Sequence, residues 1–359
     1  MNAFLILEDG HVFQGQHFGA RKEVICEVVF NTSMTGYLEV LTDPSYQGQG
    51  VVMTYPLIGN YGVCLEDAES DRPWHSAFIV REISRTSSNF RRQQDLEEYL
   101  IEHDIPGISG VDTRAITKIL REEGCMGGMI TTNPDFKLDE ILPKLQAYKV
   151  TDAVKTVTRN EKEYFKGDGF KVALLDLGTK NNIAHSLNKR GCDVTVYPAF
   201  TKAEEILKDQ PDGIMLSNGP GDPKECTEII SEIQKLYQSD IPIFAICLGH
   251  QLMALATGAD TKKMRWGHRG GNHPVKDLAT GRVYISSQNH GYVIEEESIK
   301  EDVAEVSFIN VNDKSVEGLD YKNKKIRTVQ FHPEACPGPQ DTAYLFDEFL
   351  DMMKGAKNA

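Results

Sequence analysis

The pattern of apolar and polar positions differs between the first and the second half of the chain. The first half carries short apolar runs separated by polar segments that contain glycine, proline, asparagine and serine, a pattern typical of β-strands joined by turns and loops. The strands expected from these runs span residues 3–7, 12–18, 24–30 and 51–55. The first half is therefore predicted to be β-rich.

Helical spacing appears later in the first half. Apolar residues at helical spacing over 113–123, followed by Gly124, predict a helix with a glycine stop. A second helix is expected at 96–103, and a third at 135–147, where Pro143 should kink or split it.

A weakly periodic segment separates the two halves. Residues 151–170 are charged and show little apolar periodicity, which indicates a linker. We therefore expect an N-terminal domain over 1–150, a linker over 151–170 and a C-terminal domain over 171–359.

In the second half, strands and helices alternate. Mostly apolar runs at 172–177, 194–197, 213–217 and 242–246 predict buried strands, with helices between them. Repeated strand–helix–strand units predict an α/β fold: a mostly parallel sheet flanked by helices, with chemistry at the carboxyl ends of its strands. Farther along, we expect a polar loop at 288–292.

The strand at 242–246 stops abruptly at Cys247, and a helix is expected over 248–257. A residue at such a sharp turn has a strained backbone, so the positions two before and two after it must be small, as Ala245 and Gly249 are. The helix directs its free N–H groups and positive dipole end at the sulfur, which favours the thiolate. Cys247 is therefore a candidate nucleophile.

A base for this nucleophile is found near the C-terminus. His332 and Glu334 follow a predicted strand, and residues two apart in an extended segment point to the same side. Glu334 would accept a hydrogen bond from one imidazole nitrogen and raise the basicity of the other. Cys247, His332 and Glu334 form a candidate catalytic triad.

Structural explanations compete with each functional one. A free cysteine is usually an inert core thiol, but the sharp turn and the His-x-Glu pair favour a nucleophile at Cys247. His250, in the first turn of the same helix, is expected to be a packing residue. Residues 267–273 contain two histidines without a third ligand at suitable spacing, so a polar hairpin is favoured and no metal site is expected.

The glycine-rich loop after the strand at 213–217 offers an oxyanion site. Because Pro220 has no N–H, the amides of Gly219, Gly221 and Leu248 are the candidate donors. This loop composition is also common in plain turns.

Composition limits the binding partners and the cellular compartment that can be expected. The formal charge of −14 disfavours a nucleic-acid surface, which requires a basic footprint. Seven scattered cysteines without CxxC spacing indicate a reducing compartment. With neither a signal-peptide pattern nor an apolar run of about 18 residues, we expect a cytoplasmic protein without membrane contact.

Together, the motifs resemble two known families. The second half resembles class I glutamine amidotransferases in the segments ICLGHQ (246–251), SNGPGDP (217–223) and FHPEA (331–335). The first half resembles the N-terminal domain of the carbamoyl phosphate synthetase small-subunit family in EVVFNTSMTGY (27–37), LTDPSY (41–46) and GISGVDTRAITKIL (107–120). One departure is Ala245, where the family usually carries glycine.

The resemblance implies a role for each matching position. Cys247 would attack the side-chain amide of L-glutamine to give a glutamyl thioester, while His332 relays protons and Glu334 orients it. The backbone at Gly219 and Leu248 would hold the oxyanion. The positions implied to bind glutamine are Ser45, Gly219, Gly221, Leu248, Gln251, Asn289, Gly291 and Tyr292.

The resemblance also implies a partner. Ammonia would pass to a large synthetase subunit that makes carbamoyl phosphate from bicarbonate and ATP, for pyrimidine and arginine biosynthesis. No cofactor is expected in this chain, whereas ATP and Mg or Mn are expected in the partner, which the first domain would contact to form a heterodimer. The alternatives are an amidotransferase subunit of another pathway and a non-catalytic regulatory subunit.

Overall fold

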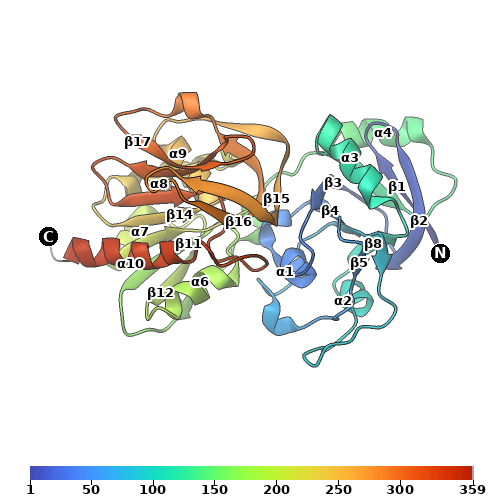
Figure 1. The fold of residues 1–359 in the computed structure, drawn as a ribbon, viewed down its shortest axis with the longest axis horizontal. Helices are drawn as coiled ribbons and strands as arrows, with labels where there is room; N and C mark the ends of the chain where they lie inside the picture. The colour runs from blue at the N-terminus through green and yellow to red at the C-terminus, as the bar shows by residue number, and fades with distance from the viewer. Residues whose placement is uncertain (358–359) are drawn as a thin grey trace. The chain divides into compact units, whose positions relative to one another are not determined.

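The computed structural model, which describes residues 1–357, consists of two compact units, Met1–Thr151 and the part from Asp152 onward (Figure 1). Each unit combines strands with helices, which confirms the predicted α/β class.

The first unit is built on a closed β-barrel with strand order β1-β2-β8-β6-β4-β3-β9. Its barrel strands are β1 (Asn2–Leu7), β2 (Val12–Gly19), β3 (Val24–Asn31), β4 (Gln49–Met53), β6 (Ala77–Ile79), β8 (Pro106–Ser109) and β9 (Met126–Thr131). Its other elements are α1 (Tyr37–Thr42), η1 (Pro44–Tyr46), β5 (Leu57–Ile58), η2 (Leu65–Asp67), β7 (Glu82–Ile83), α2 (Leu96–Glu102), α3 (Thr113–Glu123) and α4 (Leu138–Ala147).

The helices of the first unit follow their sequence signals closely. Helix α3 ends at Gly124, whose φ of 106° only glycine adopts easily, so the predicted stop is confirmed. Helix α4, however, continues through Pro143 without being split. Ile141 and Leu145 on either side of this proline are buried in one cluster with Ile6 of β1, and this packing offsets the lost backbone hydrogen bond.

In the second unit, a mixed sheet has the order β10-β12-β11-β13-β14-β19-β18-β17-β15-β16. Strands β12, β11, β13, β14 and β19 are parallel, and antiparallel strands extend both sides. The strands are β10 (Glu163–Phe165), β11 (Lys171–Asp176), β12 (Asp193–Pro198), β13 (Gly213–Leu216), β14 (Ile243–Ile246), β15 (Thr261–Asp277), β16 (Val283–Ile294), β17 (Ala304–Asn310), β18 (Val316–Tyr321) and β19 (Ile326–Val329).

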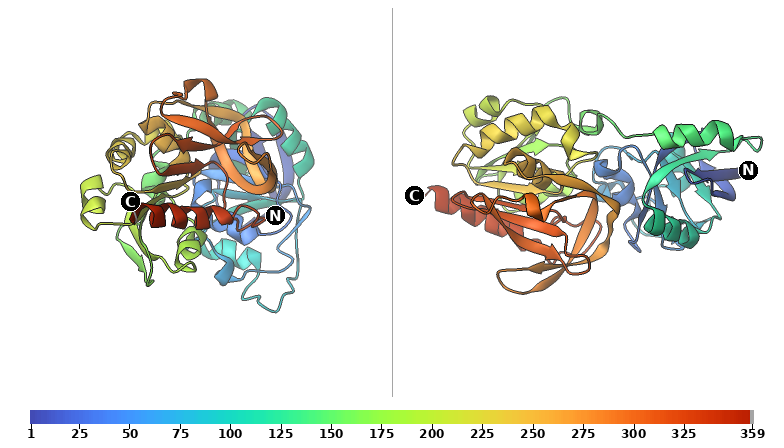
Figure 2. Two further views of the ribbon diagram at one scale, coloured as in Figure 1. Left: turned by 60° about the vertical axis from the view of Figure 1, so that its left-hand side comes forward. Right: turned by 90° about the horizontal axis from the view of Figure 1, so that it is seen from above.

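Helices cover both faces of this sheet (Figure 2). Ala173 and Leu175 of β11 pack in one core with α7, α8 and α9, whereas Val172 and Leu174 pack in another with α6 and α10. The helical elements are α5 (Ala153–Val157), α6 (Asn181–Asn188), α7 (Ala203–Lys208), η3 (Pro223–Glu225), α8 (Thr227–Tyr237), α9 (Leu248–Ala256), η4 (Glu296–Ser298) and α10 (Tyr344–Lys357). Burial on both faces explains the continuous apolar runs of the parallel strands.

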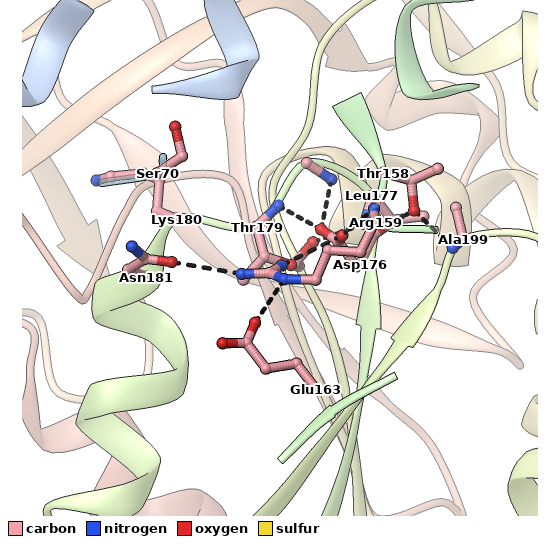
Figure 3. Close-up of polar contacts among 12 residues, drawn as sticks. Ser70, Thr158, Arg159, Glu163, Asp176, Leu177, Thr179, Lys180, Asn181 and Ala199 are labelled. Carbon is pink, nitrogen blue, oxygen red and sulfur yellow. Dashed lines mark hydrogen bonds and ion pairs between the residues drawn. The ribbon is translucent and has the colours of Figure 1, made fainter. Parts of the chain in front are cut away.

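The segment expected as a linker is instead an ordered part of the second unit. It contains α5 and β10; Val154 and Val157 are buried, and β10 pairs antiparallel with β12. Its charged residues make internal contacts (Figure 3): the Arg159 backbone N–H donates to the Asp176 carboxylate at 2.7 Å, and its guanidinium pairs with Glu163 at 2.7 Å. The charges that indicated a solvated linker thus fix this segment to the end of β11.

Two polar segments expected outside regular strands lie within long ones. Residues 288–292 belong to β16, and residues 267–273 belong to β15, which has register shifts at His268 and His273. Polar side chains of these segments have partners elsewhere in the second unit; Gln288, for example, donates to Glu317 of β18 at 2.8 Å. Of the helices in the described range, none is both long and apolar enough to cross a bilayer.

Candidate active site

Cys247 occupies the sharp turn between β14 and α9, with φ 53° and ψ −105°. This region is costly for a residue with a side chain, and the surroundings hold it in place. The Cys247 N–H donates to the carbonyl of Val329 at 2.8 Å, and its carbonyl accepts from the N–H of Gln251 at 3.1 Å. The turn predicted from the sequence is present.

The two small residues that flank this turn are constrained differently. A Cβ atom at Gly249 would lie 2.6 Å from the carbonyl oxygen of Leu216, so only glycine fits. Ala245 is fully buried in β14, in register with Leu216 and Thr328, and its methyl group belongs to the core. The turn therefore accommodates alanine at 245 but no side chain at 249.

His332 and Glu334 form a buried pair. Nδ1 of His332 lies 2.6 Å from Oε1 of Glu334, and the two residues are 1% and 5% exposed. The local conformation differs from the extended one expected: His332 bridges to Ser287, and its carbonyl accepts from the N–H of Ala335 in a turn. The turn, rather than the two-residue repeat of a strand, brings the side chains together.

Charges inside this site favour an imidazolium–carboxylate pair. Burial disfavours the charged form of His332, but the charge of Glu334, the hydrogen bond to Glu334 and the proximity of Cys247 raise the pKa of His332 above its ordinary value. Burial also opposes ionisation of Glu334, yet the charges of Lys180 and His332 hold its pKa below the ordinary value. The imidazole and the carboxylate thus form a hydrogen-bonded pair, and Cys247 lies close enough to influence the charge of the ring, although Nε2 of His332 makes no hydrogen bond within residues 1–357.

Lys180 is a member of this site that the sequence reasoning missed. Its Nζ lies 3.1 Å from Oε1 of Glu334 and also donates to the carbonyl of Ala335, and its side chain is 3% exposed. Its N–H donates to the side-chain oxygen of Asn218 at 3.0 Å. Lys180 could have been considered from the sequence, because it follows β11 closely and functional residues were expected at the carboxyl ends of the parallel strands.

The candidate oxyanion elements lie against each other. A Cβ atom at Gly219 would be 2.8 Å from Cδ2 of Leu248, which places this loop beside the start of α9. Gly221 has φ 91°, a conformation that favours glycine.

Strand β16 brings three predicted glutamine-binding positions to Cys247 and α9. The Cys247 thiol donates to the carbonyl of Asn289 at 3.6 Å, and Nε2 of Gln251 donates to the carbonyl of Tyr292 at 2.9 Å. Gly291 lies between them on this strand. The remaining predicted position, Ser45, lies in the first unit, where its N–H donates to Asp43 at 2.9 Å.

Two family models match this chain, one in each unit. The family described as glutamine amidotransferase class-I matches residues 173–352, and the family described as carbamoyl-phosphate synthase small chain, CPSase domain, matches residues 5–130. A solved structure of a glutamine amidotransferase from Thermotoga maritima is 17% identical with a TM-score of 0.40; the match covers 53% of this chain and 86% of that one.

Similarity to curated relatives extends over the whole chain. The carbamoyl phosphate synthase small chain of Clostridium perfringens is 53% identical over 98% of this chain and 99% of its own length. That of Listeria monocytogenes serovar 1/2a is 52% identical over 98% of this chain and 96% of its own. This chain therefore belongs to the carbamoyl phosphate synthase small chain family and carries a class-I glutamine amidotransferase domain.

Proposed function

We propose that this chain hydrolyses L-glutamine through Cys247, His332 and Glu334 and supplies the ammonia to a large synthase subunit. One observation carries the proposal: a cysteine on a strained turn at a helix N-terminus interacts with a buried imidazole that a carboxylate holds at 2.6 Å. Nucleophile, base and orienting group are the parts that acyl transfer requires.

The chemistry follows from these positions. The proton of the Cys247 thiol passes to His332, the sulfur attacks the amide carbon of glutamine, and a C–S bond forms. His332 gives a proton to the departing nitrogen, so the C–N bond breaks and ammonia leaves. His332 then takes a proton from water, whose oxygen attacks the thioester; the C–S bond breaks, glutamate leaves, and His332 returns the proton to the sulfur. Glu334 holds the imidazole and stabilises its charged form.

The oxyanion of each tetrahedral intermediate needs hydrogen-bond donors. The backbone at Gly219 and Leu248 is proposed for this role, because the loop and the start of α9 lie together beside the nucleophile. The other predicted glutamine-binding positions are Ser45, Gly221, Gln251, Asn289, Gly291 and Tyr292.

Membership in the small-chain family supports the proposal that the ammonia passes to a large subunit. A small chain of carbamoyl phosphate synthase implies a large-subunit partner, and we propose that this partner uses the ammonia with bicarbonate and ATP to make carbamoyl phosphate. ATP and its Mg or Mn ions belong to the partner in this scheme. The first unit, which matches the small-chain family, is the proposed partner-binding part.

The proposal is tested by glutamate release from glutamine. Cys247→Ser should lower kcat by about 10³-fold or more, because the alcohol is a much weaker nucleophile than the activated thiol. Cys226→Ser is the matched control: Cys226 precedes α8 as its N-cap, where serine is well tolerated, so this variant should keep its activity. Equal hydrolysis by the Cys247→Ser protein would rule out the triad.

A reconstituted complex tests the partner. With the large subunit, glutamine and ammonia should both support carbamoyl phosphate synthesis, and the Cys247→Ser protein should lose only the glutamine-dependent reaction. If glutamine supports synthesis equally well without this chain, the proposed ammonia supply is wrong. If the wild-type chain binds its partner but a glutamine-like electrophile fails to label Cys247, a non-catalytic regulatory role replaces it.

A further inference from the structure

A cluster of buried ligand atoms lies in the antiparallel part of the second unit. His268 of β15, His290 of β16 and Glu317 of β18 each offer one ligand atom, and these atoms lie within 4.8 Å of one another. The three residues are 6%, 5% and 0% exposed. His268 and His290 face each other directly across the β15–β16 pair, and the third ligand that the sequence lacked is supplied by a strand distant in the sequence.

The two histidines are oriented as metal ligands are. Nδ1 of His290 lies 2.7 Å from the carbonyl of Tyr292, which only accepts, so Nδ1 carries the proton and Nε2 has its lone pair available. Nε2 of His268 lies 2.8 Å from a carboxylate oxygen of Asp313. Ligating histidines commonly bond their second ring nitrogen to a carbonyl or carboxylate in this way.

The ring nitrogens that face the cluster, in contrast, make no hydrogen bond to a described residue. Neither Nε2 of His290 nor Nδ1 of His268 has a hydrogen-bond partner within residues 1–357. Nδ1 of His268 is 3.5 Å from Oε1 of Glu317, which is long for a hydrogen bond but close to the roughly 3.4 Å that separates two ligands on one tetrahedral zinc ion.

Glu317 is also held in place. Asn310 donates to Oε1 at 3.0 Å and Gln288 donates to Oε2 at 2.8 Å, so the carboxylate is fixed by amides. We propose that His268, His290 and Glu317 bind a divalent transition-metal ion, with Zn²⁺ as the best fit. Two imidazoles and one carboxylate suit zinc, whereas calcium and magnesium prefer all-oxygen sites.

The ion would act as a structural clamp. It would join β15, β16 and β18, and β16 also carries the Asn289 carbonyl that accepts from the Cys247 thiol. The competing arrangement is a protonated His268 that bridges Asp313 and Glu317. A metal-binding experiment on the intact chain distinguishes the bound ion from the protonated histidine, because only the first arrangement retains an ion.

The experiment uses the full chain with Cys247→Ser, which removes the active-site thiol as a competing zinc ligand. After treatment with a chelator, the protein is loaded with Zn²⁺ or Co²⁺, separated from free ion and analysed for metal. We expect about one ion per chain, a thermal midpoint raised by zinc, and visible Co²⁺ bands without thiolate charge transfer. A thiolate band, or no retained ion, would overturn the proposal.

Variants locate the ion. Glu317→Gln and His268→Asn should each lower zinc affinity at least tenfold, and Asp313→Asn, which changes a half-exposed residue, should lower it about 10- to 100-fold with little risk to folding. His250→Asn is the control: His250 is equally buried and has one unpartnered ring nitrogen, but its other nitrogen bonds Thr328 outside the cluster. If Asp313→Asn retains wild-type affinity, or the control loses zinc equally, the assignment is wrong.

Discussion

One carboxylate oxygen at the active site serves two cationic groups. Oε1 of Glu334 lies 2.6 Å from the His332 ring and 3.1 Å from the ammonium of Lys180, and all three side chains are almost fully buried. An isolated buried carboxylate would tend to take up a proton; Lys180 prevents this. Lys180 is therefore expected to act on catalysis indirectly, by keeping Glu334 ionised.

Replacing Lys180 tests this indirect role. Lys180→Met should lower kcat for glutamine hydrolysis by about 10- to 100-fold, less than loss of a general base costs, because His332 remains present but poorly oriented. Its pH–rate profile should also shift, since the pKa of Glu334 rises without the ammonium. Lys235→Met, which removes a half-exposed partner of the buried Glu232 in α8 and leaves that carboxylate paired with Lys202, should change neither. An unshifted profile in Lys180→Met would contradict the role.

The His332–Glu334 pair also predicts how stability depends on pH. The lowered pKa of Glu334 stabilises the fold above its ordinary value of 4.5, and this contribution is lost as pH falls. The raised pKa of His332 stabilises the fold below its ordinary value of 6.5, and this contribution is lost as pH rises. The combined effect is largest between these two values.

Urea unfolding across pH measures this effect. The free energy of unfolding lost in Glu334→Gln should reach about 3–5 kcal/mol near pH 5.5, the middle of that window, and shrink toward either side. Glu305→Gln, at an exposed position of β17, should show no such window. A loss independent of pH would show that packing, and not ionisation, accounts for it.

Some of these residues could be predicted from the sequence and others could not, because their contacts span different distances along the chain. His332 and Glu334 are two positions apart, so their encounter is local and visible in the sequence. Lys180 and Glu334 are 154 positions apart and meet only when the carboxyl ends of the parallel strands come together. The same holds for Glu317, which reaches His268 only through strand pairing.

At the scale of elements, the close approach of α9 to β13 depends on one missing side chain. Gly249 donates its N–H to the carbonyl of Ser217 at 3.0 Å, and any Cβ would contact Leu216. The helix can therefore begin directly after the nucleophile, with its N-terminus beside the sulfur.

An added methyl group tests this contact. Gly249→Ala should destabilise the protein by about 1–3 kcal/mol through overpacking, and it should lower activity because α9 shifts away from Cys247. Gly355→Ala in α10 meets nothing within 4 Å and should raise stability by up to about 1 kcal/mol. Thermal unfolding and glutamate release compare the two. Equal stability of both variants would refute the close-packing argument.

Elements with strong local signals were predicted accurately, and those formed by long-range pairing were not. Helix α3 has clear periodicity, and its predicted span of 113–123 agrees with the structure. Strand β9, with the sequence MGGMIT, has no such pattern and is held by pairing with β1 and β3. The polar segment in β16 resembled a loop because important partners of its side chains, such as Glu317 of β18, lie far away in the sequence.

At the scale of the whole molecule, the two units have separate hydrophobic cores. Among the described residues, each apolar cluster draws its members from one unit only. The second unit begins at Asp152, because Val154 joins its core and Arg159 holds Asp176.

Fragments test this boundary. Residues 152–359 should unfold cooperatively, whereas residues 171–359 lack α5 and β10 and should be less stable by at least about 3 kcal/mol, the value of burying two valines. In the full chain, Val154→Ala should cost about 1–3 kcal/mol. Equal unfolding midpoints for the two fragments would mean that the segment is a linker after all.

The burial of the nucleophile has a consequence for chemical labelling. The Cys247 residue is only 2% exposed, so a bulky thiol reagent should consume other cysteines before it reaches this one. The partly exposed cysteines are Cys64, Cys125, Cys226 and Cys336. A large maleimide should therefore modify these cysteines before the protein loses activity, whereas a small electrophile should inactivate it after fewer thiols have reacted.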